Sequence, residues 1–430
     1  MRDRLRSFYC DHLSIMRGKY LPEEKIGSGY TRFAQPNFAV HYDKDLILDA
    51  PGTECMTGLP DMELRWQATD VRPGWEPHTR VVMGDLYDRH NAPVAVSGRH
   101  ALRRAVADWQ KHGLNPVVGL ELECYAFTRA EDGGLRPYDT PGGAVYGTGP
   151  FADPAGFMDA IWQAAEIADF RLALMTTEYD APQFEFTLWH DEALRAVDDL
   201  VLFRLMAREL AIQRGVLLTF LPKPLPETGG SGLHVNLSFT DSAGHNALSD
   251  SPDTGAETMN ALATGCVAGW MRHHKGLSGL IAPSANSYAR LQPASMSGYW
   301  RNWAVDHRGV SVRVAGEPGA KARIEHRTAD AAANPYSAVA ALLQAARLGF
   351  EGGYELPPAE TGDCFTGQDA TEGTADNLAG ALDDLAADTA LTRAVGEALC
   401  AHHIHMKHVE VEKTRDLSPE ALRDFYIWFI

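Results

Sequence analysis

The sequence predicts an α+β protein with two domains, residues 1–95 and residues 96–430. Short β-prone pieces separated by turn residues fill the first range, whereas helical and strand patterns are interleaved through the second. A chain of 430 residues is long enough for two domains. The pattern changes near Arg99, where a helical periodicity begins, and this change sets the expected boundary.

The first range is predicted to be a small sheet-rich unit. Its β-prone pieces are bounded by clusters of Gly, Pro, Asn and Asp, which favour turns. The expected strands are residues 38–42, 46–48 and 80–86.

The second range is predicted to mix helices and strands without internal repeats. Helices are expected over residues 100–112, 153–169 and 191–214, and strands over 119–127, 184–188 and 233–239. Apolar residues at helical spacing from Leu378 to Leu399 predict two more helices, the second capped by Asp388 or Thr389. A Gly-, Pro- and Thr-rich loop is expected over 355–375.

Composition narrows the classes of function. The 57 acidic and 39 basic residues give a net charge of −18, which argues against nucleic acid or an anionic membrane as the main partner. An anionic small substrate remains compatible, because a site can be locally positive. No apolar run reaches the roughly 18–20 residues that a membrane span needs, and no secretory signal is visible. With six scattered cysteines, the expectation is a cytoplasmic protein with free thiols.

Two glutamates one residue apart are the most informative feature of the chain. Glu121 and Glu123 lie in an apolar, β-prone run, so both side chains are expected on the same face of a strand. Adjacent carboxylates repel each other, and a divalent cation with a preference for oxygen ligands relieves that repulsion. A solvated strand face is the commoner explanation for an isolated Glu-x-Glu.

Further segments supply ligands for a metal and phosphate site. Each has an ordinary alternative: a histidine after glycines is usually structural, and Arg-x-Glu-x-Arg is usually a surface ion-pair ladder. The candidate ligands and cations are Glu178 and Glu185 around a turn, His234 after the turn Gly229–Gly232, Glu325 between Arg323 and Arg327, and Arg290, Arg308 and Arg313 in a basic stretch.

Taken together and in order, these motifs resemble those of the glutamine synthetase family over nearly the whole chain. The segments that carry the resemblance are 17–19, 121–123, 178–185, 230–234, 286–291, 306–308, 323–327 and 333–336. The resemblance implies a β-grasp N-terminal domain and a catalytic domain with a curved antiparallel sheet flanked by helices. It also implies a ring-type homo-oligomer, whose rings are commonly stacked, with active sites between neighbouring subunits.

The resemblance also implies roles for individual residues. One cation would bind Glu123, Glu178 and Glu185, and a second would bind Glu121, His234 and Glu325. The remaining roles would be catalysis by Arg308, Arg327 and Glu325, substrate binding by Arg290, Gly230, Gly232, Asp61 and Tyr146, and ATP binding by Arg313, Arg323, Asn236 and Ser238.

The implied reaction uses ATP and Mg²⁺ or Mn²⁺ to phosphorylate the γ-carboxylate of glutamate, after which an amine displaces phosphate. A Walker-type phosphate loop is absent from the sequence. Asn236 stands where many family members have a second histidine, and His307 where an asparagine is commoner. All six ligand positions are filled, so a non-catalytic member is a remote alternative. A guanidino kinase is also remote, because it should lack the Asn-Ser-Tyr and Arg-Ile-Glu motifs in this order.

One departure bears on the amine. Ammonia-using members carry a glutamate on a flap that corresponds to residues 292–303, and this segment contains no acid. An alkylamine, polyamine or aromatic amine would instead contact Met296, Tyr299 or Trp300. Glutamine synthesis from ammonia is the alternative, with Asp49 or Asp61 of a neighbouring subunit supplying the acid.

Two groups of histidines invite a metal-site interpretation. They are the tract 401–408 and the pair His273 and His274. Both fall in segments expected to be helical, and we predict histidines on helix surfaces rather than a metal centre.

Overall fold

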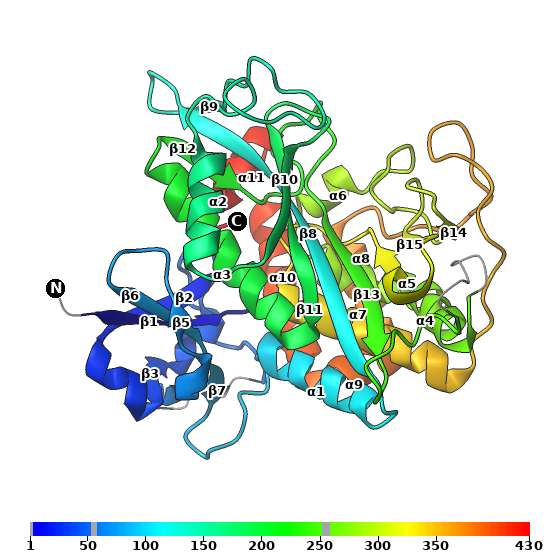
Figure 1. Ribbon diagram of the computed structural model, residues 1–430, viewed down its shortest axis with the longest axis horizontal. Helices are drawn as coiled ribbons and strands as arrows, with labels where there is room; N and C mark the ends of the chain where they lie inside the picture. The colour runs from blue at the N-terminus through cyan, green and yellow to red at the C-terminus, as the bar shows by residue number, and fades with distance from the viewer. Residues whose placement is uncertain (1–2, 53–57, 252–258) are drawn as a thin grey trace.

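The computed structural model describes residues 3–52, 58–251 and 259–430, and Figure 1 shows a small N-terminal unit beside a larger one. The small unit contains two sheets, with strand orders β2-β1-β6-β5 and β3-β4-β7. Strand β1 pairs antiparallel with β2 and parallel with β6. The strands are β1 Arg4–Cys10, β2 Met16–Pro22, β3 Tyr30–Ala34, β4 Asp61–Arg65, β5 Arg72–Pro73, β6 Thr79–Met83 and β7 Asp85–Tyr87.

The predicted strands of this unit are partly wrong. Residues 80–86 do form strand, but Gly84 divides them into β6 and β7. Residues 35–39 form a 3₁₀ helix with Pro36 in its first turn, and Val40 and Leu46 share only an isolated bridge. Phe38 is buried in the core of the unit, so its apolar character serves packing rather than a strand.

One large sheet dominates the rest of the molecule. Its strand order is β10-β11-β8-β13-β16-β15-β14, and β9 and β12 pair with β8. The pairs are antiparallel except for β14 with β15, which are parallel. The strands are β8 Asn115–Arg129, β9 Leu135–Pro137, β10 Leu172–Thr177, β11 Gln183–Glu192, β12 Val216–Thr219, β13 Leu233–Thr240, β14 Trp303–Val305, β15 Val312–Val314 and β16 Ile324–His326.

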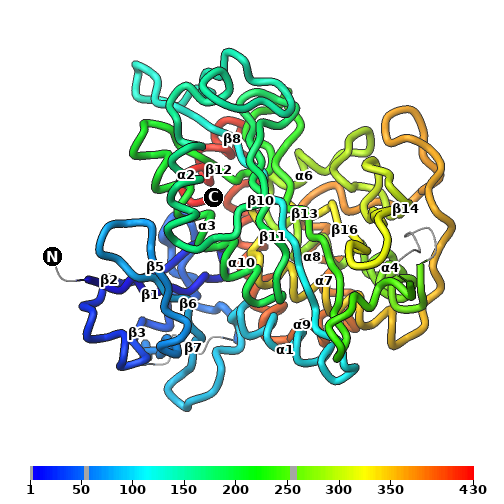
Figure 2. Tube along the Cα trace, viewed as in Figure 1, coloured from blue at the N-terminus to red at the C-terminus, as the bar shows by residue number. Residues whose placement is uncertain are grey.

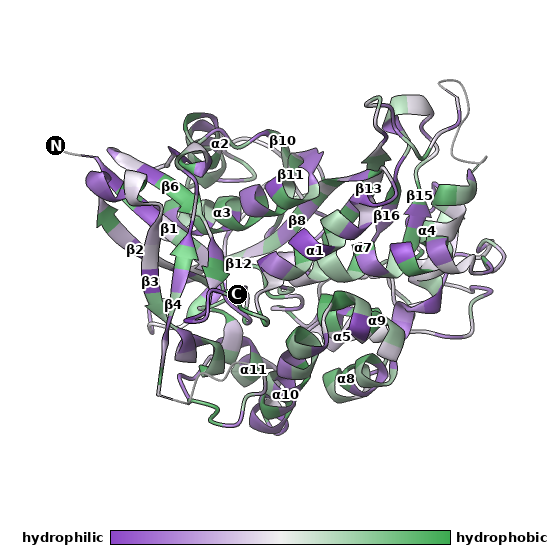
Figure 3. Cartoon of the chain, turned by 90° about the horizontal axis from the view of Figure 1, so that it is seen from below, coloured by the Kyte–Doolittle hydropathy of each residue, from purple (hydrophilic) through white to green (hydrophobic). Residues whose placement is uncertain are grey.

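Helices cover one face of this sheet. Figure 3 shows α1 and α7 next to β8 and β13, with α5 and α8–α11 farther away. The helices are α1 Gly98–Gln110, α2 Phe157–Ile167, α3 Ala193–Ile212, α4 Ala261–Arg272, α5 His274–Ile281, α6 Ser287–Arg290, α7 Pro335–Gly352, α8 Leu378–Ala387, α9 Thr389–Val395, α10 Glu397–Thr414 and α11 Pro419–Tyr426. The helices predicted over 100–112, 153–169 and 191–214 correspond to α1, α2 and α3, although Asp191 and Glu192 belong to β11. The range Leu378 to Leu399 contains parts of three helices, α8, α9 and α10, rather than the two predicted, because Gly396 separates α9 from α10. The segment 355–375 contains no helix or strand, as predicted.

Alternation along β8 separates the core from the open face. Val118, Leu120 and Leu122 are at most 2% exposed and belong to the core between sheet and helices. Glu121 and Glu123 alternate with them and therefore project from the opposite face. The same strand thus supplies both the packing and the polar surface.

The C-terminal helices contact the N-terminal unit. Figure 2 shows the course of the chain through both parts. His402 of α10 is 1% exposed, and its Nε2 lies 2.8 Å from the Phe38 carbonyl oxygen. His273 and His274 are also buried, beside Asp388 and the Tyr299 carbonyl oxygen. The prediction of surface positions for these three histidines is therefore wrong, because each fills a structural hydrogen-bonding site.

Two further properties concern the described residues. Cys10, Cys124, Cys266, Cys364 and Cys400 are free and buried, and Cys55 lies outside the described residues. No helix in the described part of the chain combines the length and apolarity needed to cross a membrane.

Asp388 links two helices and yields a stability prediction. Its Oδ1 accepts the Leu391 N–H at 3.1 Å, which caps α9, and its Oδ2 lies 2.7 Å from His273 Nδ1. Replacing Asp388 with Ala removes both contacts, and we expect a loss of about 2 kcal/mol in the free energy of unfolding, measured by urea denaturation. Asp388→Asn keeps a capping oxygen and should lose less than half as much. Equal losses in the two variants would contradict the capping role.

Candidate active site

Strand register places the acidic residues in a row across the open face of the sheet. Glu185 on β11 is opposite Glu123 on β8, and Glu121 on β8 is opposite His234 on β13. Glu325 on β16 is opposite Asn236 on β13. Directly paired residues in a sheet share a face, so four strands contribute to one polar surface.

The first cluster contains Glu121, His234 and Glu325, with one ligand atom of each lying within 4.8 Å of the others. His234 Nδ1 is 3.1 Å from Glu121 Oε2 and 3.6 Å from Glu325 Oε1. Two carboxylates and an imidazole form a donor set suited to a divalent cation.

The second cluster contains Glu123, Glu178 and Glu185, with the same spacing of ligand atoms. Glu178 directly follows β10, and Glu185 lies near the start of β11, so the turn between the strands brings them together. Burial, followed by the nearby carboxylates of Glu178 and Glu121, raises the pKa of Glu185 to about 7. A cation would remove this repulsion.

The first cluster has the opposite balance of charge. Burial alone would raise the pKa of Glu121, but hydrogen bonds with His234 and Asn236 outweigh it and lower the pKa to about 2. Burial and Arg327 oppose protonation of His234, yet Glu121 and Glu123 raise its pKa above the usual value. The carboxylates on either side of His234 thus favour a positive charge at this position.

The glycine-rich turn before β13 allows close approach to both clusters. A Cβ atom on Gly232 would lie 2.9 Å from Arg290 Nη2 and 3.0 Å from His234 Nε2. The Gly232 N–H donates to Glu123 Oε2 at 2.8 Å. Gly230 has φ of +144°, a conformation that favours glycine.

Gln183 has a positioning role that motif reasoning did not assign. Its Nε2 donates to Glu123 Oε2 at 3.0 Å and to the Gly230 carbonyl at 2.9 Å. The Tyr125 hydroxyl donates to its Oε1 at 3.3 Å. Gln183 therefore joins the second cluster to the glycine-rich turn. Its position two residues before Glu185, on the same strand face, was the available signal in the sequence.

Arginines surround Glu325. Arg327 Nη1 donates to Glu325 Oε1 at 2.6 Å, and Arg313 Nη1 donates to Oε2 at 3.4 Å. Arg290 Nη1 donates to the Thr328 carbonyl at 3.0 Å, and its Nη2 donates to the Arg327 carbonyl at 3.3 Å. These contacts produce a positive rim next to the acidic clusters.

Three other expected residues lie at the edges of this surface. Arg323 Nε donates to Asn236 Oδ1 at 3.2 Å. Ser238 follows Asn236 by two residues on β13 and so shares its face. Arg308 is exposed, and its carbonyl accepts from Arg327 Nε at 3.2 Å.

The structure does not bring every expected residue into the clusters. Tyr146 is 74% exposed, although its N–H bonds to the Thr177 carbonyl at 2.9 Å, next to Glu178. Asp61 is exposed on β4 of the N-terminal unit. Asp49, in the same unit, is also exposed and lies 3.1 Å from His405 Nε2.

The chain is similar to known proteins of one family. Residues 95–425 match the family described as glutamine synthetase, catalytic domain. A glutamine synthetase of Halobacterium salinarum is 26% identical over 437 residues, covering 99% of this chain and 93% of that protein. Gamma-glutamylethanolamide synthetase GlnA4 of Streptomyces coelicolor is 31% identical over 366 residues, covering 83% and 76%.

A comparison with solved structures gives the same family of folds. A solved structure described as a novel glutamine synthase homolog superposes with a TM-score of 0.85 at 24% identity, covering 100% of this chain and 99% of the other. This likeness confirms the α+β fold, with its small N-terminal sheet unit and its large sheet flanked by helices. The chain belongs to the glutamine synthetase family and is a ligase of the ATP-dependent, carbon–nitrogen bond-forming class.

Proposed function

We propose that this enzyme forms a γ-glutamyl amide from L-glutamate, ATP and an amine other than ammonia, through a γ-glutamyl phosphate intermediate. The observation that carries the proposal is the flap, residues 292–303, which contains no acidic residue. Ammonium is small and strongly hydrated, so its capture depends on carboxylates, whereas a substituted amine also gains from apolar contact.

A hydrogen bond to Thr328 connects the flap to the part of the chain that also contacts Arg290. Thr328 Oγ1 donates to the Gly298 carbonyl at 2.8 Å, and the Thr328 carbonyl accepts from Arg290. Met296 lies two residues before Gly298 and is 49% exposed. This attachment supports a position for the Met296 thioether near the bound glutamate.

Tyr299 and Trp300 of the flap already have hydrogen-bond partners. Trp300 Nε1 donates to the Pro293 carbonyl at 2.9 Å, and the Tyr299 hydroxyl donates to Asp376 Oδ1 at 3.2 Å. These bonds stabilise the flap. Met296 is therefore the side chain we assign to the amine substituent, which would be an alkyl, polyamine or aromatic group.

The donor atoms of the two clusters fit a pair of divalent cations. In the proposal, Glu123, Glu178 and Glu185 hold one, and Glu121, His234 and Glu325 hold the other. Bound Mg²⁺ or Mn²⁺ would neutralise charge on the transferring phosphoryl group. The number of oxygens and the single imidazole suit these hard cations. Burial and the neighbouring carboxylates raise the pKa of Glu185 to about 7, and a bound cation would offset both effects.

The chain's own side chains then position the reactants. Arg290, Arg308 and Arg327 would hold glutamate and the phosphoryl oxygens by bidentate hydrogen bonds, with Gly230, Gly232 and Tyr146 lining the substrate side. The residues assigned to ATP are Arg313, Arg323, Asn236 and Ser238. Asp61 would act across a subunit interface in a ring-type homo-oligomer, with residues 1–95 of one copy against residues 96–430 of the next.

Glutamine synthesis from ammonia is the second candidate, because relatives of both kinds match the chain. It requires an acid from elsewhere, and Asp49 and Asp61 are exposed in the N-terminal unit and so available to a neighbouring copy. GlnA4, whose name specifies ethanolamine as the amide partner, supports the first candidate.

An amine panel tests the choice. With glutamate and ATP present, ADP release should saturate at lower concentrations of an alkyl, polyamine or aromatic amine than of ammonium. We expect kcat/KM for the best amine to exceed that for ammonium by at least about tenfold, because apolar contact adds roughly 1.4 kcal/mol or more. Saturation by low-millimolar ammonium, with no amine better, would reject the proposal.

Substitution of Met296 provides a second readout. Met296→Glu should lower kcat/KM for the best amine by about tenfold and raise that for ammonium, since a carboxylate attracts a small cation and repels apolar substituents. Met296→Leu keeps an apolar side chain of similar size and serves as the matched control. An identical amine preference in the two variants would place Met296 outside the acceptor pocket.

Gln183 yields a prediction on cation affinity. Gln183→Ala removes the hydrogen bond that orients Glu123, so we expect Mn²⁺ to bind about 10–100-fold more weakly, measured by calorimetry without substrates. The control is Gln110→Ala on α1, where the side chain is exposed and donates to Asn115 Oδ1 at 3.2 Å, away from the clusters. Unchanged Mn²⁺ affinity in Gln183→Ala would contradict a positioning role.

A further inference from the structure

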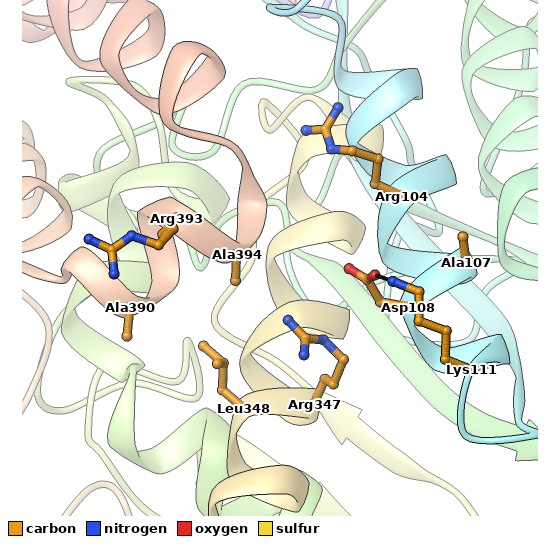
Figure 4. Close-up of a pocket in the computed structure, with 9 residues that line it drawn as sticks. All are labelled: Arg104, Ala107, Asp108, Lys111, Arg347, Leu348, Ala390, Arg393 and Ala394. Carbon is orange, nitrogen blue, oxygen red and sulfur yellow. Dashed lines mark hydrogen bonds and ion pairs between the residues drawn. The ribbon is translucent and has the colours of Figure 1, made fainter.

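Outside the two glutamate clusters, charged side chains gather around a cleft of about 700 Å³ between α1, α7 and α9 (Figure 4). Its guanidinium groups lie apart from one another, and Arg347 already donates to Gln344 Oε1 at 2.8 Å and to Glu351 Oε2 at 2.6 Å. Cations that are separated and already paired offer no common seat for a ligand. Buried polar contacts converge instead at the flap.

The flap is bonded along its second half to the segment that follows α7. The Arg301 N–H donates to the Glu372 carbonyl at 2.8 Å, and the Thr374 N–H donates to the Tyr299 carbonyl at 2.9 Å. The segment 355–375 contains no helix or strand of its own. Its conformation and that of the flap therefore depend on each other.

Glu360 is a buried carboxylate at the start of the loop 360–370 within this segment, and it is 7% exposed. Its Oε1 accepts the Gly362 N–H at 2.9 Å and the Asp369 N–H at 2.7 Å, and its Oε2 accepts the Ala370 N–H at 3.2 Å. Burial alone would raise the pKa of Glu360, but these hydrogen bonds, together with one from the flap, outweigh it and lower the pKa. The ionised carboxylate therefore closes the loop.

The same carboxylate contacts the end of the flap. Asn302 Nδ2 donates to Glu360 Oε2 at 3.0 Å, and the Glu360 N–H donates to the Trp303 carbonyl at 2.8 Å. Asn302 is itself only 5% exposed. A hydrogen bond to a charged group that is shielded from water is stronger than one between neutral groups. Glu360 therefore joins the loop firmly to the flap.

Asn302 extends this connection to the candidate active site. Its Oδ1 accepts the Ser311 N–H at 3.0 Å, and Ser311 Oγ donates to the Asn302 carbonyl at 2.7 Å. The Ser311 carbonyl in turn accepts the Arg327 N–H at 2.8 Å. A chain of hydrogen bonds thus leads from Glu360 through the flap to an arginine that contacts Glu325.

We propose that Glu360 is a positioning residue, which holds the flap through Asn302 so that the amine rather than water reaches the reactive carbonyl carbon. This role rests on the γ-glutamyl phosphate intermediate of the proposed function. When water attacks that carbon instead, its bond to the phosphate oxygen breaks. Phosphate, glutamate and a proton are then released, and ATP is consumed without amide formation. Exclusion of water by a closed site limits this loss.

Hydrogen–deuterium exchange tests the contact without any substrate. In Glu360→Gln, the amide places N–H donors against Asn302 or against backbone N–H groups, whichever way it is turned. We expect residues 298–303 to exchange about tenfold faster than in wild type, because the loss of one hydrogen bond to a charged group shifts a local equilibrium by about that factor. Exchange in α7 should be unchanged, since the core stays folded. Unchanged exchange in the flap overturns the proposal.

The ratio of ADP released to amide formed tests the consequence for the reaction. It is measured with the best acceptor, ammonium included, and does not depend on the fraction of active enzyme. We expect the excess of ADP over amide to rise about tenfold in Glu360→Gln, because an open flap admits water. A wild-type ratio in this variant overturns the proposal. If wild type makes no amide from any acceptor, the proposed function is rejected, while the exchange result still decides whether Glu360 holds the flap.

Further variants separate the pair from a general effect on the loop. Asn302→Asp alone should also raise the ratio, because two carboxylates then face each other. When it is combined with Glu360→Gln, the new amide can donate to the new carboxylate, and the ratio should return to within about twofold of wild type.

Asp369→Asn is the matched control. Asp369 is exposed, and its Oδ2 accepts from Thr361 Oγ1 at 2.7 Å inside the same loop. Its ratio of ADP to amide should stay within about twofold of wild type, because its bond does not reach the flap. A ratio raised equally in this control, or no recovery in the double variant, overturns the assignment to the pair of Glu360 and Asn302.

Discussion

The mutual repulsion of carboxylates on one face of a sheet is the constraint on which the rest of this structure depends. Five glutamates and one histidine lie within two clusters, and burial together with the neighbouring carboxylates raises the pKa of Glu185 to about 7. Strand register holds them in place, because a slip of one residue on β8 would turn Glu121 and Glu123 into the apolar core. Packing of the core therefore holds the carboxylates close together despite their mutual repulsion.

The residues around the clusters offset this repulsion in different ways. Arg327 and Arg313 neutralise Glu325 directly. Gln183 and the Gly232 N–H supply neutral donors to Glu123, which stabilise its charge without competing for the face that remains open. The arginines and the neutral donors both fix the orientation of carboxylate oxygens, which would otherwise rotate away from one another. Under the proposed function, this set of oxygens would be preorganised, which would lower the reorganisation needed for cations and nucleotide to bind.

The N-terminal unit is connected to this site by buried hydrogen bonds. Arg204 Nη2 donates to the Ser14 carbonyl at 2.7 Å, and Asn334 Nδ2 donates to the Asp11 carbonyl at 2.8 Å. Asn334 also caps α7, and it follows Arg327 by seven residues. Arg17 Nε donates to the buried Asp11 at 2.7 Å. The motifs around Arg17 and Asn334 thus have a structural explanation, since they join the two units.

The sequence by itself determined the alternation on β8, the helical periodicity of α1 and α3, and the residue types of a cation and phosphate site, because these follow from local spacing and charge. Only the tertiary structure decided that Phe38 packs in a 3₁₀ helix and that His273, His274 and His402 are buried. It also decided that Gln183 orients Glu123 and that Glu360 contacts Asn302 at the end of the flap. Those outcomes depend on contacts between segments far apart in the chain, whose geometry no local pattern contains.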